Sequence, residues 1–426
     1  MNKYPILAVS LFLLTYIFLA SCRNNDAKTT APTWPITVNP PSSTHARTYA
    51  LASDASSLYI AGNDNGPGAS NYEWRTEKRR LSDGQLITDF GINGVALSPL
   101  GGANAPSAIA SDSTSLYIAG YDTRYGNAEW RIEKRSLSTG KPVTSPLFGT
   151  SGVVADNPGG FNDIPYAAAL DSTALYVAGM EGVSSADTQW RIVKRSLTDG
   201  SLIAAFGTNG VVTSTTGSNT NEARALVIDL AESALYIVGF ESATAADTQW
   251  RIEKRNLLDG QLVTAFGTNG VITGGPGKAF AAALDSTALY VAGYDSGIGA
   301  VDTQWKIAKY DLTSGAAVAA FGTNGVVAGN PGAAGDAINA IVIDGAGLYA
   351  AGYDSVPGNG DTAWRLEKRN ATTGALIPAF AANGVYRSSS GEASALTSGA
   401  AALYMAGYDT EPGNNGTEWR IEKIAK

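Results

Sequence analysis

Polar and apolar residues alternate through a seven-residue phrase that recurs along most of the chain. In the copy from Thr188 to Lys194, TQWRIVK, the Trp, Ile and Lys share one side of an extended backbone, whereas Arg191, and Arg195 directly after the phrase, point to the other side. Such period-two alternation predicts a β-strand. Seven of the eight tryptophans stand at this place in the phrase: Trp74, Trp130, Trp190, Trp250, Trp305, Trp364 and Trp419.

Successive copies of the phrase are separated by 56, 60, 60, 55, 59 and 55 residues. A fixed period of this size indicates a repeat architecture. Each unit also contains an aliphatic run, a LYIAG phrase and a Gly-rich segment such as 206–212, all rich in the residue types of strands. No helical periodicity is sustained after residue 21. We therefore predict an all-β fold in which each unit is a four-stranded antiparallel meander.

Such sheets can bury their apolar faces only by stacking on one another. A β-propeller stacks four to eight four-stranded blades around an axis, so seven copies predict a seven-bladed β-propeller over residues 47–426. An open solenoid is the alternative, but it would leave its two end sheets uncovered. The last copy lacks its fourth segment, and Trp34–Asn39 resembles that segment. We expect this N-terminal strand to pair with the last blade and close the ring.

Residues 1–21 resemble the signal peptide of a bacterial lipoprotein. Ile6–Leu19 is apolar but shorter than the roughly 20 residues of a membrane-spanning helix, and it leads into a Leu-Ala-Ser-Cys sequence that resembles a lipobox. The resemblance implies cleavage before Cys22 and acylation of this cysteine, which anchors the protein to a membrane when several chains are attached. Residues 22–46 then form a tether that includes the closing strand. Arg23 favours the outer membrane, with the body either periplasmic or surface-exposed.

The repeated phrase Phe-Gly-x-Asn-Gly-Val-Val, found at 206–212, 266–272 and 321–327, resembles the delta-60 repeat family of β-propellers. The similarity extends over essentially residues 47–426. The Trp phrase departs from the family pattern, as do the altered copies at Phe380-Ala381 and Ser151-Gly152. The resemblance implies an extracytoplasmic propeller, and it implies no particular activity because the family has no shared catalytic motif.

Composition excludes several classes of function. The net charge is −8, and Lys and Arg form no run outside the repeat, so we expect no nucleic-acid partner. We also expect the protein to be a monomer. The single histidine, His45, falls in the tether, where we expect it to be solvated. Neither a Ser-His-Asp triad nor a His-ligated metal site can then be assembled in the body. No phosphate-binding glycine motif occurs in a strand-to-helix context.

The units differ in length at particular places. From each Trp to the Gly of the Gly-Val phrase the count is 20 residues in five units and 22 in the second, whereas the segments on either side of the LYIAG phrase vary more. In a propeller, the loops joining strands two and three emerge on the same face as the loops joining successive blades. Since loops on a rigid scaffold carry function, we expect recognition on this variable face. The alternative interpretation is sequence drift in loops that are under no functional constraint, which explains the same differences in length.

An acidic residue follows the Gly of every LYIAG phrase by two positions: Asp64, Asp122, Glu181, Glu241, Asp295, Asp354 and Asp409. A ring of such carboxylates could attract a cation such as Ca²⁺. The favoured interpretation is structural, because strand pairing brings each acid near the base that follows the Trp of its unit, giving cross-strand ion pairs. The tryptophans likewise could stack on sugars, but we expect them to pack between blades.

Two functional hypotheses remain open. The first is a membrane-anchored, non-catalytic binding or scaffolding module for a protein, peptide or glycan on the variable face. The second is a carbohydrate-active enzyme, a glycosidase or lyase that uses a pair of carboxylates on the same face. An enzyme predicts acids without basic partners in one pocket, whereas a binding module predicts a shallow apolar or aromatic patch among the variable loops. We assign no catalytic residue and no obligatory cofactor.

Overall fold

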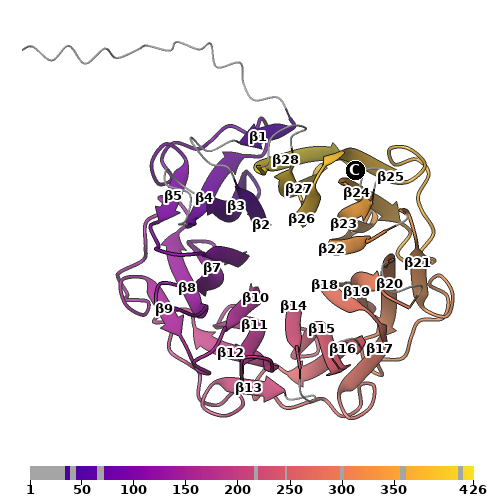
Figure 1. The fold of residues 1–426 in the computed structure, drawn as a ribbon, viewed down its shortest axis with the longest axis horizontal. Helices are drawn as coiled ribbons and strands as arrows, with labels where there is room; N and C mark the ends of the chain where they lie inside the picture. The colour runs from indigo at the N-terminus through magenta and orange to yellow at the C-terminus, as the bar shows by residue number, and fades with distance from the viewer. Residues whose placement is uncertain are drawn as a thin grey trace, which may run out of the picture. The chain divides into compact units, whose positions relative to one another are not determined.

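The computed structural model describes residues 34–38, 45–64, 72–214, 219–244, 247–297, 302–332, 334–355, 361–410 and 416–426. The predicted signal peptide, Cys22 and most of the tether lie outside these residues. The described chain forms seven four-stranded antiparallel sheets arranged as blades around a central axis (Figure 1). Within it, no helix is long and apolar enough to cross a membrane. The predicted seven-bladed β-propeller is confirmed.

Six blades are built from four consecutive strands each. The first to third blades contain β2 (Arg47–Ser53), β3 (Ser57–Asp64), β4 (Glu73–Arg80) and β5 (Val95–Ser98); β6 (Ala105–Ser111), β7 (Ser115–Asp122), β8 (Glu129–Ser136) and β9 (Val153–Asp156); and β10 (Ile164–Leu170), β11 (Ala174–Gly182), β12 (Thr188–Ser196) and β13 (Val211–Ser214). The fourth to sixth blades contain β14 (Glu222–Asp229), β15 (Ala234–Thr244), β16 (Asp247–Asn256) and β17 (Val271–Pro276); β18 (Lys278–Leu284), β19 (Ala288–Asp295), β20 (Gln304–Asp311) and β21 (Val326–Gly329); and β22 (Ala337–Asp344), β23 (Gly347–Ser355), β24 (Thr362–Arg369) and β25 (Val385–Ser390).

The seventh blade joins the two ends of the propeller. Its strands are β26 (Glu392–Ser398), β27 (Ala402–Asp409), β28 (Glu418–Ala425) and, as the outermost strand, β1 (Ile36–Val38). β1 pairs antiparallel with β28, with Ile36 opposite Ile421 and Val38 opposite Trp419 (Figure 1). In the second blade, Val154 is opposite Ile132 and Asp156 is opposite Trp130. The predicted closure is therefore confirmed for residues 36–38, in the register of an ordinary outer strand.

The fourth segment of each unit is only partly a strand, contrary to the expectation that it runs from the Phe-Gly phrase onward. In the third blade the strand begins at Val211, and residues 204–210 form a turn. Asn209 and Gly210 have φ angles of 53° and 89°, which a pleated strand does not allow. The turn instead places Phe206 against Tyr176, with ring centroids 6.1 Å apart.

The tryptophans fasten each blade to the next one. All seven in the repeat are buried, with at most 3% of the residue exposed. Trp190 illustrates the arrangement, since its Nε1 donates to the carbonyl of Phe240 in the following blade at 3.1 Å. Five more copies form the same bond, including Trp419, which donates to Asn63 and so joins the last blade to the first. Packing between blades is confirmed as the role of these rings.

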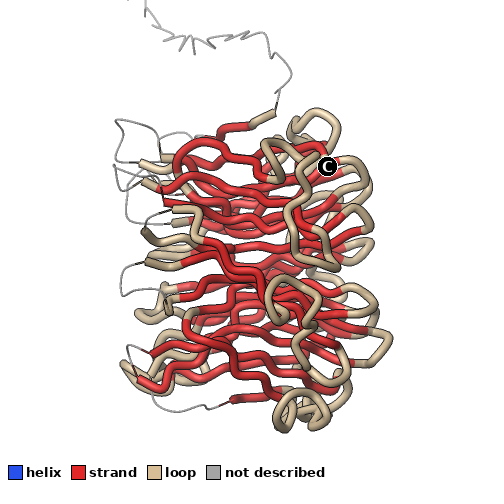
Figure 2. Tube along the Cα trace, turned by 90° about the vertical axis from the view of Figure 1, so that its right-hand side faces the viewer, coloured by secondary structure: helices blue, strands red, loops and turns tan. Residues whose placement is uncertain are grey.

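In six units the lysine four residues after the Trp reaches the same neighbouring blade, where its Nζ donates to a backbone carbonyl. Lys194 Nζ donates to the carbonyl of Leu257 at 2.8 Å and lies 5.2 Å from the ring centre of Tyr176 in its own blade. The Trp and the Lys therefore act at opposite ends of the third strand. Figure 2 shows the result from the side, with strands crossing the molecule between two faces that carry loops.

Candidate functional site

The variable loops meet on one face of the propeller, as the sequence predicted. The segment before β10 lies against the loop before β8, where the amide of Asp163 donates to the carbonyl of Ala128 at 2.8 Å. One blade further on, the amide of Thr188 donates to the carbonyl of Asn219 at 3.1 Å. Loops between strands two and three therefore lie beside loops between successive blades. We call this surface the variable face.

Each of the seven acids at the ends of the second strands forms an ion pair with the base expected for it. The pairs are Asp64–Arg75 (3.4 Å), Asp122–Arg131 (3.6 Å), Glu181–Arg191 (3.0 Å), Glu241–Arg251 (2.8 Å), Asp295–Lys306 (3.1 Å), Asp354–Arg365 (3.2 Å) and Asp409–Arg420 (2.9 Å). The cross-strand interpretation is thus confirmed. Among the described residues, no three Asp, Glu, His or Cys side chains form a group suited to hold a metal ion.

His45 does not lie in a solvated tether. It forms a parallel β-bridge with Thr417, next to the first inner strand, while its side chain remains exposed. The amide of the following residue, Ala46, donates to the Thr417 carbonyl at 2.9 Å. The tether thus ends before His45, because this segment already belongs to the seam between the last and first blades.

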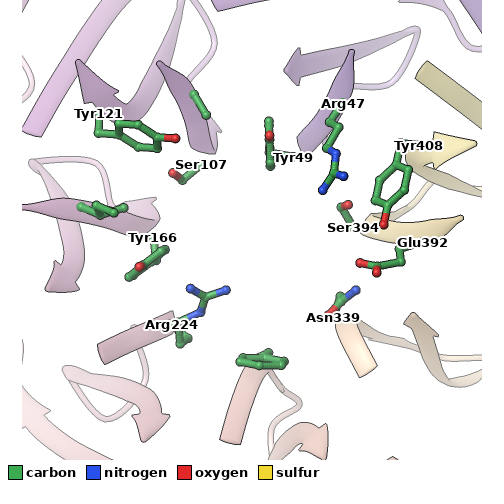
Figure 3. A pocket seen from close by; sticks show the side chains of 13 residues that line it. Arg47, Tyr49, Ser107, Tyr121, Tyr166, Arg224, Asn339, Glu392, Ser394 and Tyr408 are labelled. Atoms are coloured by element: carbon green, nitrogen blue, oxygen red, sulfur yellow. The ribbon is translucent and has the colours of Figure 1, made fainter. Parts of the chain in front are cut away.

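A cavity of about 410 Å³ lies where the seven innermost strands meet (Figure 3). Each of these strands contains a β-bulge two residues after its first residue, and the bulged residue lines the cavity in every blade. The seven bulged residues are Tyr49, Ser107, Tyr166, Arg224, Phe280, Asn339 and Ser394. Bulges re-aim side chains and are common next to functional sites. The seven-fold repeated backbone therefore presents seven different side chains to one space.

Sequence reasoning missed this cavity. The alternation of polar and apolar residues predicts which side of a strand each side chain faces, and a bulge interrupts that alternation. A signal was present, however. The first residue of the inner strand is neither uniformly apolar nor uniformly polar from unit to unit: Arg47, Ala105, Ile164, Glu222, Lys278, Ala337 and Glu392. Four of these residues, Arg47, Ala105, Ile164 and Glu392, line the cavity. They begin the inner strands, so the cavity opens toward the variable face.

Two arginines and several aromatic rings dominate the cavity wall. The Arg47 guanidinium lies 4.1 Å from the ring centre of Tyr408, and that of Arg224 lies 4.0 Å from the ring centre of Tyr166. Figure 3 shows both guanidinium groups pointing into the open space. Burial raises the pKa of Tyr49 to about 12 and that of Tyr166 still higher, so these phenols remain neutral hydrogen-bonding groups.

A second hollow of about 490 Å³, which we call the groove, lies on the variable face over the third blade. Its lining is rich in amides and hydroxyls, including Asn127, Asn162 and Thr188, and it contains Phe161, which is 39% exposed. Tyr125, next to the lining residue Gly126, is 73% exposed. This is the kind of aromatic patch among variable loops that a binding module predicts.

Known structures share the architecture at very low sequence identity. Drosophila Semaphorin 2a matches with a TM-score of 0.51 and 11% identity over 92% of this chain and 76% of that chain. The β-propeller domain of the Trilobed protease from Pyrococcus furiosus matches with a TM-score of 0.46 and 8% identity over 90% of this chain and 96% of that one. The shared feature is the β-propeller fold. No protein-family model and no curated protein sequence matches the chain.

Proposed function

We propose that this protein is a non-catalytic binding module whose ligand enters the central cavity from the variable face. The observation that carries the proposal is the convergence of the seven bulged residues on one cavity of about 410 Å³. A space of this size, lined by aromatic rings with a few placed polar groups, is typical of sites for small molecules or for parts of larger ones. The surrounding ring of blades holds these groups rigidly, which reduces the entropy lost on binding.

The alternative, a glycosidase or lyase, needs two carboxylates on either side of a scissile bond. The cavity lining contributes one, Glu392, from the seventh blade. Burial raises the pKa of the Tyr408 phenol, and the negative charge of Glu392 and a side-chain hydrogen bond to that carboxylate raise it further. The Glu392 carboxylate thus already interacts with another side chain of the cavity wall, which favours ligand recognition over catalysis.

We further propose that the module is held at the outer membrane of a bacterial cell by acyl chains on Cys22. The lipobox-like sequence and the resemblance to delta-60 repeat propellers support this, and Cys22 lies outside the described residues. Replacing Cys22 with Ser in the full chain should move the protein from the membrane fraction to the soluble fraction. Equal membrane association of both forms, after a carbonate wash, would exclude the anchor.

The binding proposal is tested by filling the cavity. Ser107→Trp places an indole among the bulged residues, whereas Ser138→Trp places one in an exposed turn at the end of β8, away from the variable face. The full-length protein in detergent micelles is applied to arrays of glycans and peptides. We expect every ligand of the unchanged protein to be lost with Ser107→Trp and kept with Ser138→Trp. Identical profiles for the two variants would reject the cavity as the ligand site.

A further inference from the structure

We infer that the ligand is an oligosaccharide bearing a carboxylate, with the acidic sugar in the central cavity and the chain continuing along the groove. This inference rests on the proposed function and assigns a chemical class to its ligand. It follows from three observations: the charges at the cavity, the chemistry of the groove and the wall that the two hollows share.

The cavity carries positive charge in a protein that is negative as a whole. The first and bulged positions of the inner strands hold three cations, Arg47, Arg224 and Lys278, against two carboxylates, Glu222 and Glu392, which leaves a local charge of +1. The chain as a whole has a net charge of −8. A local excess of the opposite sign in a recessed site concentrates anionic ligands there.

Arg47 is the strongest candidate for the anion contact. Its guanidinium stacks on Tyr408, and in the part of the chain that the structure describes Arg47 forms no ion pair with a carboxylate. Arg224 forms an ion pair with Glu222 through Nη1, at 3.1 Å. Stacking fixes a guanidinium in a plane while its N–H groups point outward, which is the geometry that binds a carboxylate through two parallel hydrogen bonds.

The groove suits neutral sugar residues. Asn127, Asn162, Ser184, Thr188 and Thr220 contribute amides and hydroxyls to its lining, groups that both donate and accept hydrogen bonds and so match sugar hydroxyls. Phe161 and the neighbouring Tyr125 supply exposed rings on which the apolar side of a sugar can pack. An extended peptide that binds by strand addition would need an open sheet edge, whereas this groove is lined by loops and by the ends of β11, β12 and β14.

The two hollows are separated by a wall in which side chains that line the cavity contact side chains that line the groove. Tyr166, on the cavity side, places its hydroxyl 3.8 Å from Sδ of Met180, which lines the groove. Arg224 lines the cavity, and its ion-pair partner Glu222 lines the groove. A ligand longer than one sugar can therefore occupy both hollows by crossing this wall at the variable face.

The test uses the full-length protein in detergent micelles and an array of uronate- and sialate-containing oligosaccharides printed beside their carboxyl-reduced forms. Arg47→Gln and Arg224→Gln are compared with Arg80→Gln, a 51% exposed arginine at the end of β4. Affinities of hits are then measured by calorimetry. We expect carboxyl reduction and each cavity variant to weaken binding by about 10-fold or more, with Arg80→Gln unchanged. Phe161→Ala should weaken long ligands and spare monosaccharides.

Several outcomes would overturn the inference. Equal binding of acidic and reduced sugars that is still lost with Ser107→Trp would remove the carboxylate assignment and leave the proposed function intact. Binding of acidic peptides alone would replace the sugar with a peptide. If no acidic oligosaccharide binds to the unchanged protein, the ligand class is wrong. Where a variant loses binding, an unchanged melting midpoint will show that misfolding is not the cause.

Discussion

The indole of Trp34 lies edge-on against Tyr404, with ring centroids 5.7 Å apart and planes inclined by 61°. In each of the other six blades a Phe from the turn before the outer strand takes this place, as Phe148 does against Tyr117. Trp34 and Ile36 also lie beside Gly84 of the next blade, as Phe148 and Val154 lie beside Gly200. The residue that completes the last blade thus comes from the opposite end of the propeller sequence.

Removing the Trp34 ring should weaken ring closure. Because Trp34 is partly buried, we expect Trp34→Ala to lower the free energy of unfolding by about 2–4 kcal/mol, and deletion of residues 33–40 to lower it further. Trp34→Phe is the matched control, since it installs the residue that the other blades use. Thermal melting followed by circular dichroism measures the effect. An unaltered midpoint for Trp34→Ala would show that β1 contributes nothing to closure.

The buried tryptophans test the coupling between blades. Trp190→Ala should cost about 3–5 kcal/mol, because the fully buried ring fills the space between the third and fourth blades. Trp190→Phe keeps most of this packing but leaves the Phe240 carbonyl without its donor, so we expect a loss of about 1–3 kcal/mol. Denaturant unfolding gives both values. If Trp190→Phe lowered the free energy of unfolding more than Trp190→Ala, this division into a packing contribution and a hydrogen-bond contribution would be wrong.

Asp156 replaces a missing charge in the third blade. In four blades a buried Glu stands between the two arginines of the Trp phrase, as Glu77 does between Arg75 and Arg79. Val193 occupies that position in the third blade, and there Asp156 of the preceding blade pairs with Arg195 and lies 3.9 Å from Arg191.

We expect Asp156→Ala to cost about 3–5 kcal/mol, because the largely buried Arg195 loses its counter-charge, while Arg191 keeps its ion pair with Glu181. Adding Val193→Glu to Asp156→Ala restores the pattern of those four blades and should recover much of that loss. A double-mutant cycle on denaturant unfolding measures the coupling. Additive effects of the two substitutions would refute the compensation.

Asp163 makes the stability depend on pH. Its Oδ1 accepts the Gly182 amide at 2.8 Å, and burial raises its pKa from 3.8 to about 6. The folded state therefore binds a proton more tightly than the unfolded state, so this contribution to stability is lost as pH rises from about 4 to 6.

The equivalent Asn104 and Asn221 carry an amide that donates to backbone carbonyls, at 2.9 Å to Tyr72 and 2.8 Å to Thr188. Asp163→Asn should thus stabilise the protein at pH 7 by on the order of 1 kcal/mol and much less at pH 4. Melting midpoints of both forms across this range provide the measurement. A difference that stays constant with pH would rule out the titration of Asp163.

Divalent cations should not stabilise the propeller through the ring of acids. Each of the seven carboxylates is already paired with an Arg or Lys of the adjacent strand, and a cation would have to displace that base. We expect the same melting midpoint with millimolar calcium and with a chelator. A rise of several degrees in the melting midpoint on adding calcium would instead support the hypothesis that the ring of acids binds a metal ion.

The repeat determined the architecture from sequence alone. Period-two alternation around each Trp, together with a spacing near 57 residues, predicted the strands, the number of blades, the closing strand and the partner of each acid. These features are local, or they repeat at a fixed interval, so one unit predicts the rest. The placement of Trp190 and Lys194 on the side that faces the following blade is of this kind.

The tertiary structure alone decided what the centre of the ring contains. Tyr49, Tyr166 and Arg224 belong to different units, and they become neighbours only because the ring closes and a bulge turns each of them toward the axis. Period-two alternation cannot anticipate that turn, since the bulge adds a residue to the strand. Asp156 was hidden for a related reason: it acts in a blade other than the one its sequence neighbours build, and contacts between blades are set by packing rather than by distance along the chain.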